Sequence, residues 1–108
     1  MTTERETQGC LELTSISADW DYDTQKPPTW PDNPRLLSIE FHPAAAGDVL
    51  VVRQSGSAGA LRFYAECDSD LDSRIKYFHG SRCRPYIVYS ECVLSAGHKV
   101  IIELWREP

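Results

Sequence analysis

The chain lacks features that mark several large classes of protein. Acidic residues outnumber basic ones by 16 to 11, and this balance disfavours nucleic acid as a partner, since a sequence-independent phosphate binder needs an excess of Lys and Arg. No apolar run approaches the roughly 18 residues of a membrane-spanning helix. The first ten residues lack the apolar core of a secretory signal. We therefore expect no membrane contact and a cytoplasmic location.

Motifs for common catalytic chemistry are also missing. The sequence contains no strained nucleophile turn of the G-x-S-x-G type and no Gly-rich phosphate loop. The segment Gly56-Ser57-Ala58-Gly59 shares only its composition with the nucleophile turn. Because no complete catalytic site can be assembled, we expect a protein that is not an enzyme and that needs no cofactor.

The four cysteines do not form a metal-binding or disulfide pattern. They stand at positions 10, 67, 83 and 92, and no two have the Cys-x-x-Cys spacing. A zinc set could combine His79, Cys83, Cys92 and His98, but His79 and Cys83 are its only closely spaced pair. We expect reduced thiols and no metal, with a disulfide between neighbouring strands as the alternative.

An acidic segment at residues 68–73 (DSDLDS) places three carboxylates at alternate positions. An EF-hand loop would continue with Gly at its sixth position and Glu at its twelfth, where this chain has Ser73 and His79. The pattern favours a polar turn whose aspartates bond their own backbone. A looser calcium site remains the alternative.

Short apolar runs that alternate with polar residues are the dominant pattern. Leu37, Ile39 and Phe41 show the step of two that places side chains on one face of a β-strand. The unbroken apolar run 49–52 predicts a strand that is buried on both faces. Strands are expected over residues 10–16, 35–42, 48–54, 60–67, 74–78, 84–91 and 98–105.

This rhythm predicts an all-β fold, a sandwich or jelly-roll-like barrel of about seven antiparallel strands. We expect a single domain over residues 10–106, preceded by a flexible N-terminal tail at residues 1–9.

The segment 18–34 differs from the rest of the chain, because it is rich in Trp and Pro and has no periodicity. We expect a long loop there. Its aromatic residues Trp20, Tyr22 and Trp30 are the best candidates for binding a ligand, either by stacking on a sugar ring or by anchoring a partner. In the alternative, the loop folds back and the rings cap one end of the core.

A second candidate surface comes from the strand expected at residues 84–91. If Tyr86 and Val88 face inward, Ile87 and Tyr89 face out. An exposed Ile beside an exposed Tyr would form an apolar patch suited to a subunit interface.

Several short segments resemble small proteins of tailed bacteriophages and prophages. The likeness is carried by residues 47–53 (GDVLVVR), 74–80 (RIKYFHG), 84–86 (RPY) and 94–100 (LSAGHKV), and it spans about two-thirds of the chain. The resemblance implies a compact β domain that serves in or near the virion. If the chain is phage-encoded, we expect its location to be the virion. It implies no catalytic residues.

These observations predict a non-enzymatic structural or interaction protein of phage or prophage origin. We expect it to assemble with itself, or with other virion-type proteins, through the surfaces of its β-sandwich. The alternative is a small carbohydrate- or ligand-binding module that uses the tryptophans of segment 18–34.

Overall fold

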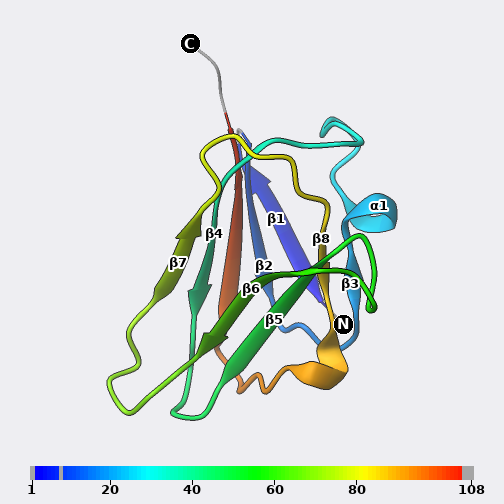
Figure 1. Cartoon of the computed structure of the whole chain (residues 1–108). Coiled ribbons are helices and arrows are strands. Elements are labelled where there is room, and N and C mark those ends of the chain that lie inside the picture. Colours follow the sequence, from blue (N-terminus) through cyan, green and yellow to red (C-terminus); the bar gives the residue numbers. More distant parts are fainter. Residues whose placement is uncertain (1, 8, 106–108) are drawn as a thin grey trace.

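Two antiparallel sheets stacked face to face form the molecule (Figure 1). The computed structural model describes residues 2–7 and 9–105. Within these residues the strands are β1 (Thr3–Thr7), β2 (Cys10–Thr14), β3 (Trp20–Asp21), β4 (Leu36–His42), β5 (Val49–Gln54), β6 (Leu61–Glu66), β7 (Arg74–Tyr77), β8 (Pro85–Ile87) and β9 (Lys99–Leu104). The short helices are α1 (Tyr22–Gln25) and the single turn η1 (Tyr89–Glu91). The prediction of an all-β sandwich is confirmed, and the two sheets stay separate, so the fold is not a closed barrel.

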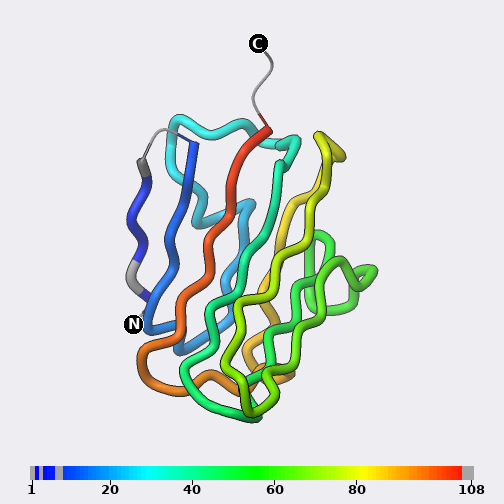
Figure 2. The backbone as a smooth tube through the Cα atoms, turned by 90° about the vertical axis from the view of Figure 1, so that its left-hand side faces the viewer, coloured from blue at the N-terminus to red at the C-terminus, as the bar shows by residue number. Residues whose placement is uncertain are grey.

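The strand order leaves the two sides of the sandwich with different edges. One sheet has the order β1-β2-β9-β4-β7 and the other has the order β3-β8-β5-β6 (Figure 2). The edge strands β6 and β7 follow each other in the chain and lie on one side of the sandwich. The edge strands β1 and β3 lie on the other side.

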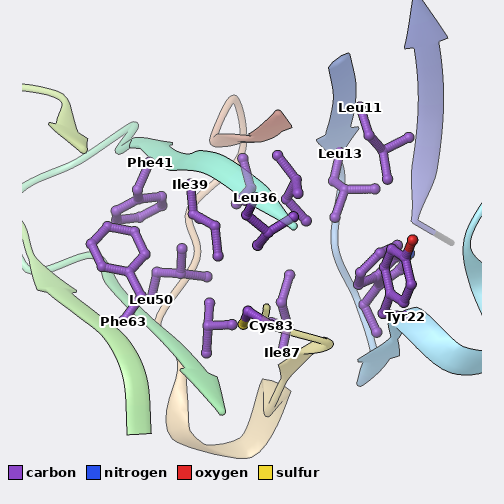
Figure 3. Close-up of a cluster of buried hydrophobic side chains, with 14 of the residues drawn as sticks. Leu11, Leu13, Tyr22, Leu36, Ile39, Phe41, Leu50, Phe63, Cys83 and Ile87 are labelled. Carbon is purple, nitrogen blue, oxygen red and sulfur yellow. The ribbon is translucent and has the colours of Figure 1, made fainter. Parts of the chain in front are cut away.

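The core lies between the sheets and is built from alternate residues of β2, β4, β5, β6, β8 and β9, together with residues of β3 and the connecting segments (Figure 3). Its fully buried members include Leu11, Leu13, Leu36, Ile39, Phe41, Leu50, Ile87 and Ile102. In β5 the outward-facing Val51 is buried as well, because the chain that follows β8 crosses over it and Val49 and Val93 pair through their backbones. The prediction that this strand is buried on both faces is confirmed.

The N-terminal segment is more ordered than the sequence predicts. Instead of a tail, residues 3–7 form β1, which pairs with β2 from Thr3 opposite Thr14 to Thr7 opposite Cys10. Residues 1, 8 and 106 of the predicted tail and domain lie outside the described residues. The sequence of β1 is polar and shows no apolar alternation. Backbone pairing with β2, rather than buried side chains, holds this strand in place.

The loop predicted at residues 18–34 contains two short elements. Trp20 and Asp21 form β3 against β8, and α1 follows at once. The Asp21 carboxylate accepts a hydrogen bond from the Asp23 N–H at 3.0 Å and caps the helix. Both elements are too short to show a period in the sequence, which is why the segment looked irregular.

In β8 the predicted side-chain orientation is wrong. Pro85 and Ile87 face the core, Ile87 with no exposed surface, while Tyr86 faces outward. The strand ends at Ile87 because Val88 is buried next and η1 then turns the chain at Tyr89. Ile87 therefore cannot contribute to a subunit interface. Tyr89 is 40% exposed, but it has no exposed Ile beside it to form the predicted patch.

A buried carboxylate ties together the loops at one end of the sandwich. Asp48 accepts hydrogen bonds from the N–H groups of Ala44 and Ala45 and from the N–H and hydroxyl of Ser95, the last at 2.6 Å. Burial opposes ionisation, but these hydrogen bonds outweigh it and hold the pKa of Asp48 below its usual value.

His98 connects these loops to a third loop through two hydrogen bonds. Its Nδ1 donates to the Ser95 carbonyl at 2.8 Å, and its Nε2 accepts from the Ile16 N–H at 3.0 Å. The segments 47–53 and 94–100, which carry the resemblance to phage proteins, thus meet at Asp48, Ser95 and His98. In this structure they position loops rather than a reacting group.

Candidate functional site

A groove lies between the edge strands β6 and β7. Its volume is about 520 Å³. We call it the edge groove and define it by the residues that line it, namely Leu61, Arg62, Phe63, Tyr64, Ile75, Lys76 and Tyr77. One wall comes from each sheet, so the groove opens into the gap between the two layers.

A β-bulge turns Arg62 toward this gap. In the β5–β6 pair, Val52 lies opposite Phe63 but Arg53 lies opposite Leu61, which leaves Arg62 as the extra residue. The Arg62 guanidinium consequently approaches the ring of Phe78, at 5.4 Å from its centroid. A regular strand would instead have sent Arg62 to the outer face of the sheet.

Lys76 reaches the same ring from the opposite wall. It is paired with Ile39 of β4, whose side chain is in the core, so Lys76 is on the inner face of its sheet. Its Nζ lies 5.5 Å from the centroid of the Phe78 ring. Two positive charges, one from each sheet, therefore converge on one aromatic ring.

Neither cation of the edge groove is neutralised by the described part of the chain. In residues 2–7 and 9–105, the side chains of Arg62 and Lys76 take part in no ion pair and no hydrogen bond, whereas Arg53, Arg74 and Arg84 each have an acidic partner. Two unpaired cations in one groove are notable in a chain of net charge −5. The groove is thus a local positive site on an acidic protein.

The field of these cations reaches a buried thiol. Burial raises the pKa of Cys83 to about 11, although the positive charges of Arg62 and Lys76 oppose that rise. At neutral pH the Cys83 thiol is therefore protonated and a poor nucleophile. The described cysteines carry no disulfide.

The rims of the edge groove are apolar and exposed. Leu61, Tyr64, Ile75 and Tyr77 are between 43% and 54% exposed. The Tyr64 hydroxyl donates to the Glu66 carboxylate at 3.1 Å, and the Tyr77 ring stacks on His79 with centroids 5.9 Å apart. Exposed tyrosines beside Arg are typical of protein interfaces. An apolar group that also carries negative charge fits this groove best.

The three aromatic residues predicted to bind a ligand lie elsewhere, inside the core. Trp20, Tyr22 and Trp30 are all buried, and Tyr22 contacts both tryptophans, with centroids 6.2 Å and 6.3 Å apart. This placement corresponds to the alternative in which the rings cap the core. No ring face is free to stack on a sugar in this conformation.

Hydrogen bonds fix this aromatic cluster in place. The Tyr22 hydroxyl donates to the Pro31 carbonyl at 2.6 Å, and the Lys26 ammonium donates to the Trp30 carbonyl at 2.8 Å. Burial, together with the negative charges of Asp32 and Asp23, raises the pKa of Tyr22 far above its ordinary value. These contacts hold segment 18–34 against the core as a structural element.

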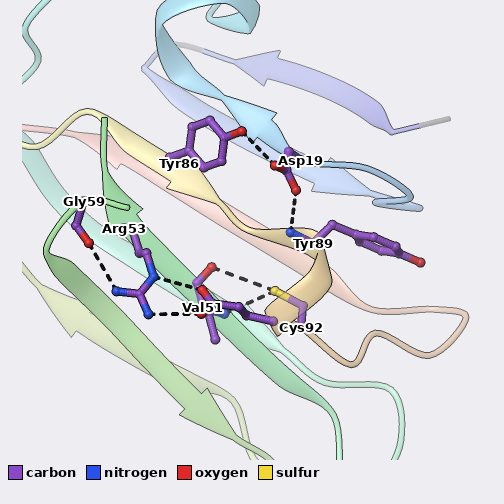
Figure 4. Close-up of polar contacts among 8 residues, drawn as sticks. Asp19, Val51, Arg53, Gly59, Tyr86, Tyr89 and Cys92 are labelled. Atoms are coloured by element: carbon purple, nitrogen blue, oxygen red, sulfur yellow. Dashed lines mark hydrogen bonds and ion pairs between the residues drawn. The ribbon is translucent and has the colours of Figure 1, made fainter. Parts of the chain in front are cut away.

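The second predicted interface residue, Tyr89, lies beside a set of structural polar contacts (Figure 4). Asp19 accepts from the Tyr86 hydroxyl at 2.7 Å and from the Tyr89 N–H at 2.8 Å. Arg53 makes a two-pronged ion pair with Glu91, at 2.9 Å and 3.1 Å. These bonds join the loop before β3 to β8 and η1, and β5 to η1.

The acidic segment forms an exposed turn at the end of the β6–β7 connection. Asp68 accepts from the Asp70 N–H at 3.0 Å and lies 3.4 Å from the Arg74 guanidinium. Its contact with its own backbone matches the predicted polar turn. Across residues 2–7 and 9–105, no three His, Cys, Asp or Glu side chains come together in a way that could hold a metal ion.

The sequence contained an indirect signal of the edge groove. Lys76 belongs to a run of basic residues that also includes Arg74, Arg82 and Arg84, for which a solvated strand face is the simplest interpretation. Arg62 stands far from this run, and the strict alternation of β6 hid its bulge. Only the pairing of β6 and β7 with different sheets brings the two cations together.

Comparison with known proteins adds no assignment to this geometry. None of the helices in the described part of the chain is long and apolar enough to cross a membrane. No family model, no curated protein and no solved structure matches the chain. The resemblance to phage and prophage proteins therefore stays a prediction.

Proposed function

We propose that this chain is a non-enzymatic interaction protein that self-associates through the edge groove. The observation that carries the proposal is the groove itself, which is lined by four exposed apolar side chains and by two cations that form no ion pair within residues 2–7 and 9–105. Large apolar side chains that stay exposed around one groove mark a site of protein contact. Covering it removes apolar area from water and gives both cations a counter-charge.

The resemblance to phage and prophage proteins supports an assembly role in or near the virion. One of its segments, residues 74–80, forms β7 and the residue under the groove, Phe78. Virion proteins work by repeated contact between copies, and an open edge of a sandwich is a suitable surface for such contact.

The proposal is tested by measuring the mass of the chain in solution across a wide concentration range. By light scattering or sedimentation, the average mass should exceed that of one 12.2 kDa chain and should rise with concentration. Replacing Ile75 by Asp should abolish this rise, because it places a charge on the apolar rim while leaving the core intact.

Tyr89→Ser is the matched comparison, because Tyr89 is also exposed and lies outside the edge groove. It should leave association unchanged. A chain that stays monomeric at every concentration would contradict the proposal, as would association that is lost in Tyr89→Ser and kept in Ile75→Asp.

A further inference from the structure

The inference concerns what occupies the edge groove, and it rests on the proposed function. We infer that the groove of one copy receives the acidic turn (residues 68–73) of a second copy, so that the chains associate head to tail. The two surfaces are different parts of the same chain, and each has what the other lacks.

The acidic turn projects an apolar side chain between two carboxylates. Leu71 is 47% exposed and stands between Asp70 and Asp72, both of them also exposed. In residues 2–7 and 9–105, neither the Asp70 nor the Asp72 carboxylate forms an ion pair, although the Arg74 guanidinium, which pairs with Asp68 at 3.4 Å, also donates to the Asp72 backbone carbonyl at 2.9 Å. The tip therefore carries two carboxylates without an ion pair beside an apolar group.

The backbone at this tip is strained. Leu71 has φ of +59°, a conformation that branched, bulky residues adopt rarely. A Gly or Asn would fit this position at lower cost and would also avoid an exposed apolar side chain. In this conformation Leu71 leaves about half of its surface exposed to solvent.

The edge groove complements this tip in charge and in polarity. One cation stands on each wall, Arg62 from β6 and Lys76 from β7, and apolar rims lie beside them. Two carboxylates on either side of one leucine match this arrangement. The groove volume of about 520 Å³ leaves room for the three side chains of the tip.

The two surfaces cannot satisfy each other within one chain. The acidic turn lies beyond the end of β6 and before the start of β7, whereas Arg62 is at the opposite end of β6 (Figure 1). The acidic turn and Arg62 are thus separated by the length of β6. A second copy placed end on brings opposite charges together.

Continued sheet pairing between edge strands is a less suitable mode of contact. Inward-pointing charges and bulges on edge strands hinder the addition of a further strand, and β6 has the bulge at Arg62 while β7 has Lys76 on its inner face. A contact through side chains in the groove avoids this obstacle. Because turn and groove are different surfaces, the contact either continues from copy to copy or closes when each of two copies places its turn in the groove of the other.

A charge-swap experiment tests the inference. The turn-reversed variant carries Asp70→Lys and Asp72→Lys, and the groove-reversed variant carries Arg62→Glu and Lys76→Glu. Each variant alone should self-associate about 100-fold or more weakly than the native chain, because like charges now meet at the contact. An equimolar mixture of the two should recover association, since both kinds of contact in the mixture again join opposite charges.

Thermal unfolding of each variant verifies that it is folded. If the groove-reversed variant does not fold, the milder pair Arg62→Gln and Lys76→Gln replaces it, and mixing it with the turn-reversed variant should give no more than partial recovery. Leu71→Ser should weaken association by about tenfold, because it removes the apolar part of the tip.

Two results would overturn the inference while leaving the proposed function standing. In the first, turn reversal leaves self-association intact although Ile75→Asp abolishes it, which would mean that groove meets groove or another surface. In the second, both reversals weaken association but their mixture does not recover it. Failure of the native chain to associate at all would instead remove both proposals.

Discussion

The two sides of this sandwich differ in how far the core between the sheets is covered. On the side of β3, the rings of Trp20, Tyr22 and Trp30 fill the space beside the core and are buried. On the side of β6 and β7, Tyr64 and Tyr77 stay exposed, and two cations stand in the opening. Aromatic residues alone therefore do not indicate which side of a sandwich is a binding surface.

The length of the connecting chain explains the difference. Between β2 and β4 a long segment is available, and it supplies β3, α1 and the rings that cover the core. Between β6 and β7 the connection is a short acidic turn that projects into solvent. Within residues 2–7 and 9–105 no segment covers the second side, so its apolar rims stay exposed.

The largest expected effect is on the covered side. Trp20→Ala should lower the free energy of unfolding by about 3–5 kcal/mol, because it removes the largest fully buried side chain and leaves a cavity. Chemical denaturation followed by circular dichroism measures the loss. Trp105→Ala should cost about 1 kcal/mol or less, since Trp105 is partly exposed near the end of the described chain.

Trp20→Phe refines this test if Trp20→Ala does not fold. The Trp20 indole N–H is buried and has no hydrogen-bond partner in the part of the chain that the structure describes. Phe removes this unsatisfied donor as well as some volume, so its cost should be clearly smaller than that of Ala. Equal losses for Trp20→Ala and Trp105→Ala would contradict the view that segment 18–34 caps the core.

An intermediate effect is expected at a charge that the fold satisfies fully. Asp48→Asn should lower the free energy of unfolding by about 1–3 kcal/mol at neutral pH, because Asn cannot accept all the hydrogen bonds that the carboxylate receives. The contribution should also depend on pH. Since the folded state lowers the pKa of Asp48, its stabilisation is present above the unfolded pKa of about 3.9 and is lost as the pH falls through the folded value.

Urea unfolding at a series of pH values checks this dependence. The difference in stability between the native chain and Asp48→Asn should be constant from pH 7 to about pH 5 and should shrink below about pH 4. A difference that does not change with pH would show that the loss in Asp48→Asn comes from packing alone.

The smallest effect is expected at the charges of the edge groove. The double variant Arg62→Gln and Lys76→Gln should change the free energy of unfolding by no more than about 1 kcal/mol, because weakened contacts with Phe78 are offset by the relief of repulsion between the cations. Denaturation at low protein concentration, where association is minimal, provides the measurement. A loss as large as that of Asp48→Asn would indicate that these cations hold the fold together.

Periodicity predicted much of the fold, and its failures have physical causes. The seven expected strands are all present, and most have enough alternating apolar residues to specify a buried face, although the apolar residues of β7, Ile75 and Tyr77, are exposed. The strand at residues 3–7 escaped notice because backbone pairing with β2 holds it, without apolar side chains. The side chains of β8 were assigned to the wrong faces because the strand is short and η1 ends the alternation at Ile87.

The candidate site was less accessible to sequence reasoning. Trp20, Tyr22 and Trp30 were rightly singled out as unusual, but composition does not distinguish rings that cap a core from rings that face a ligand. Arg62 enters the edge groove only because of a bulge, and a bulge depends on the register of two strands. No pattern within β6 itself reveals it.

The amino-acid sequence by itself determined that this protein is an all-β sandwich with a double-sided central strand and an exposed acidic turn, because burial and alternation are local properties of a strand. Only the tertiary structure decided which side of the sandwich is covered and which is open. That outcome depends on which sheet each strand joins and on how much chain lies between them, and neither follows from local pattern. The convergence of Arg62 and Lys76 on Phe78 is a product of that assembly.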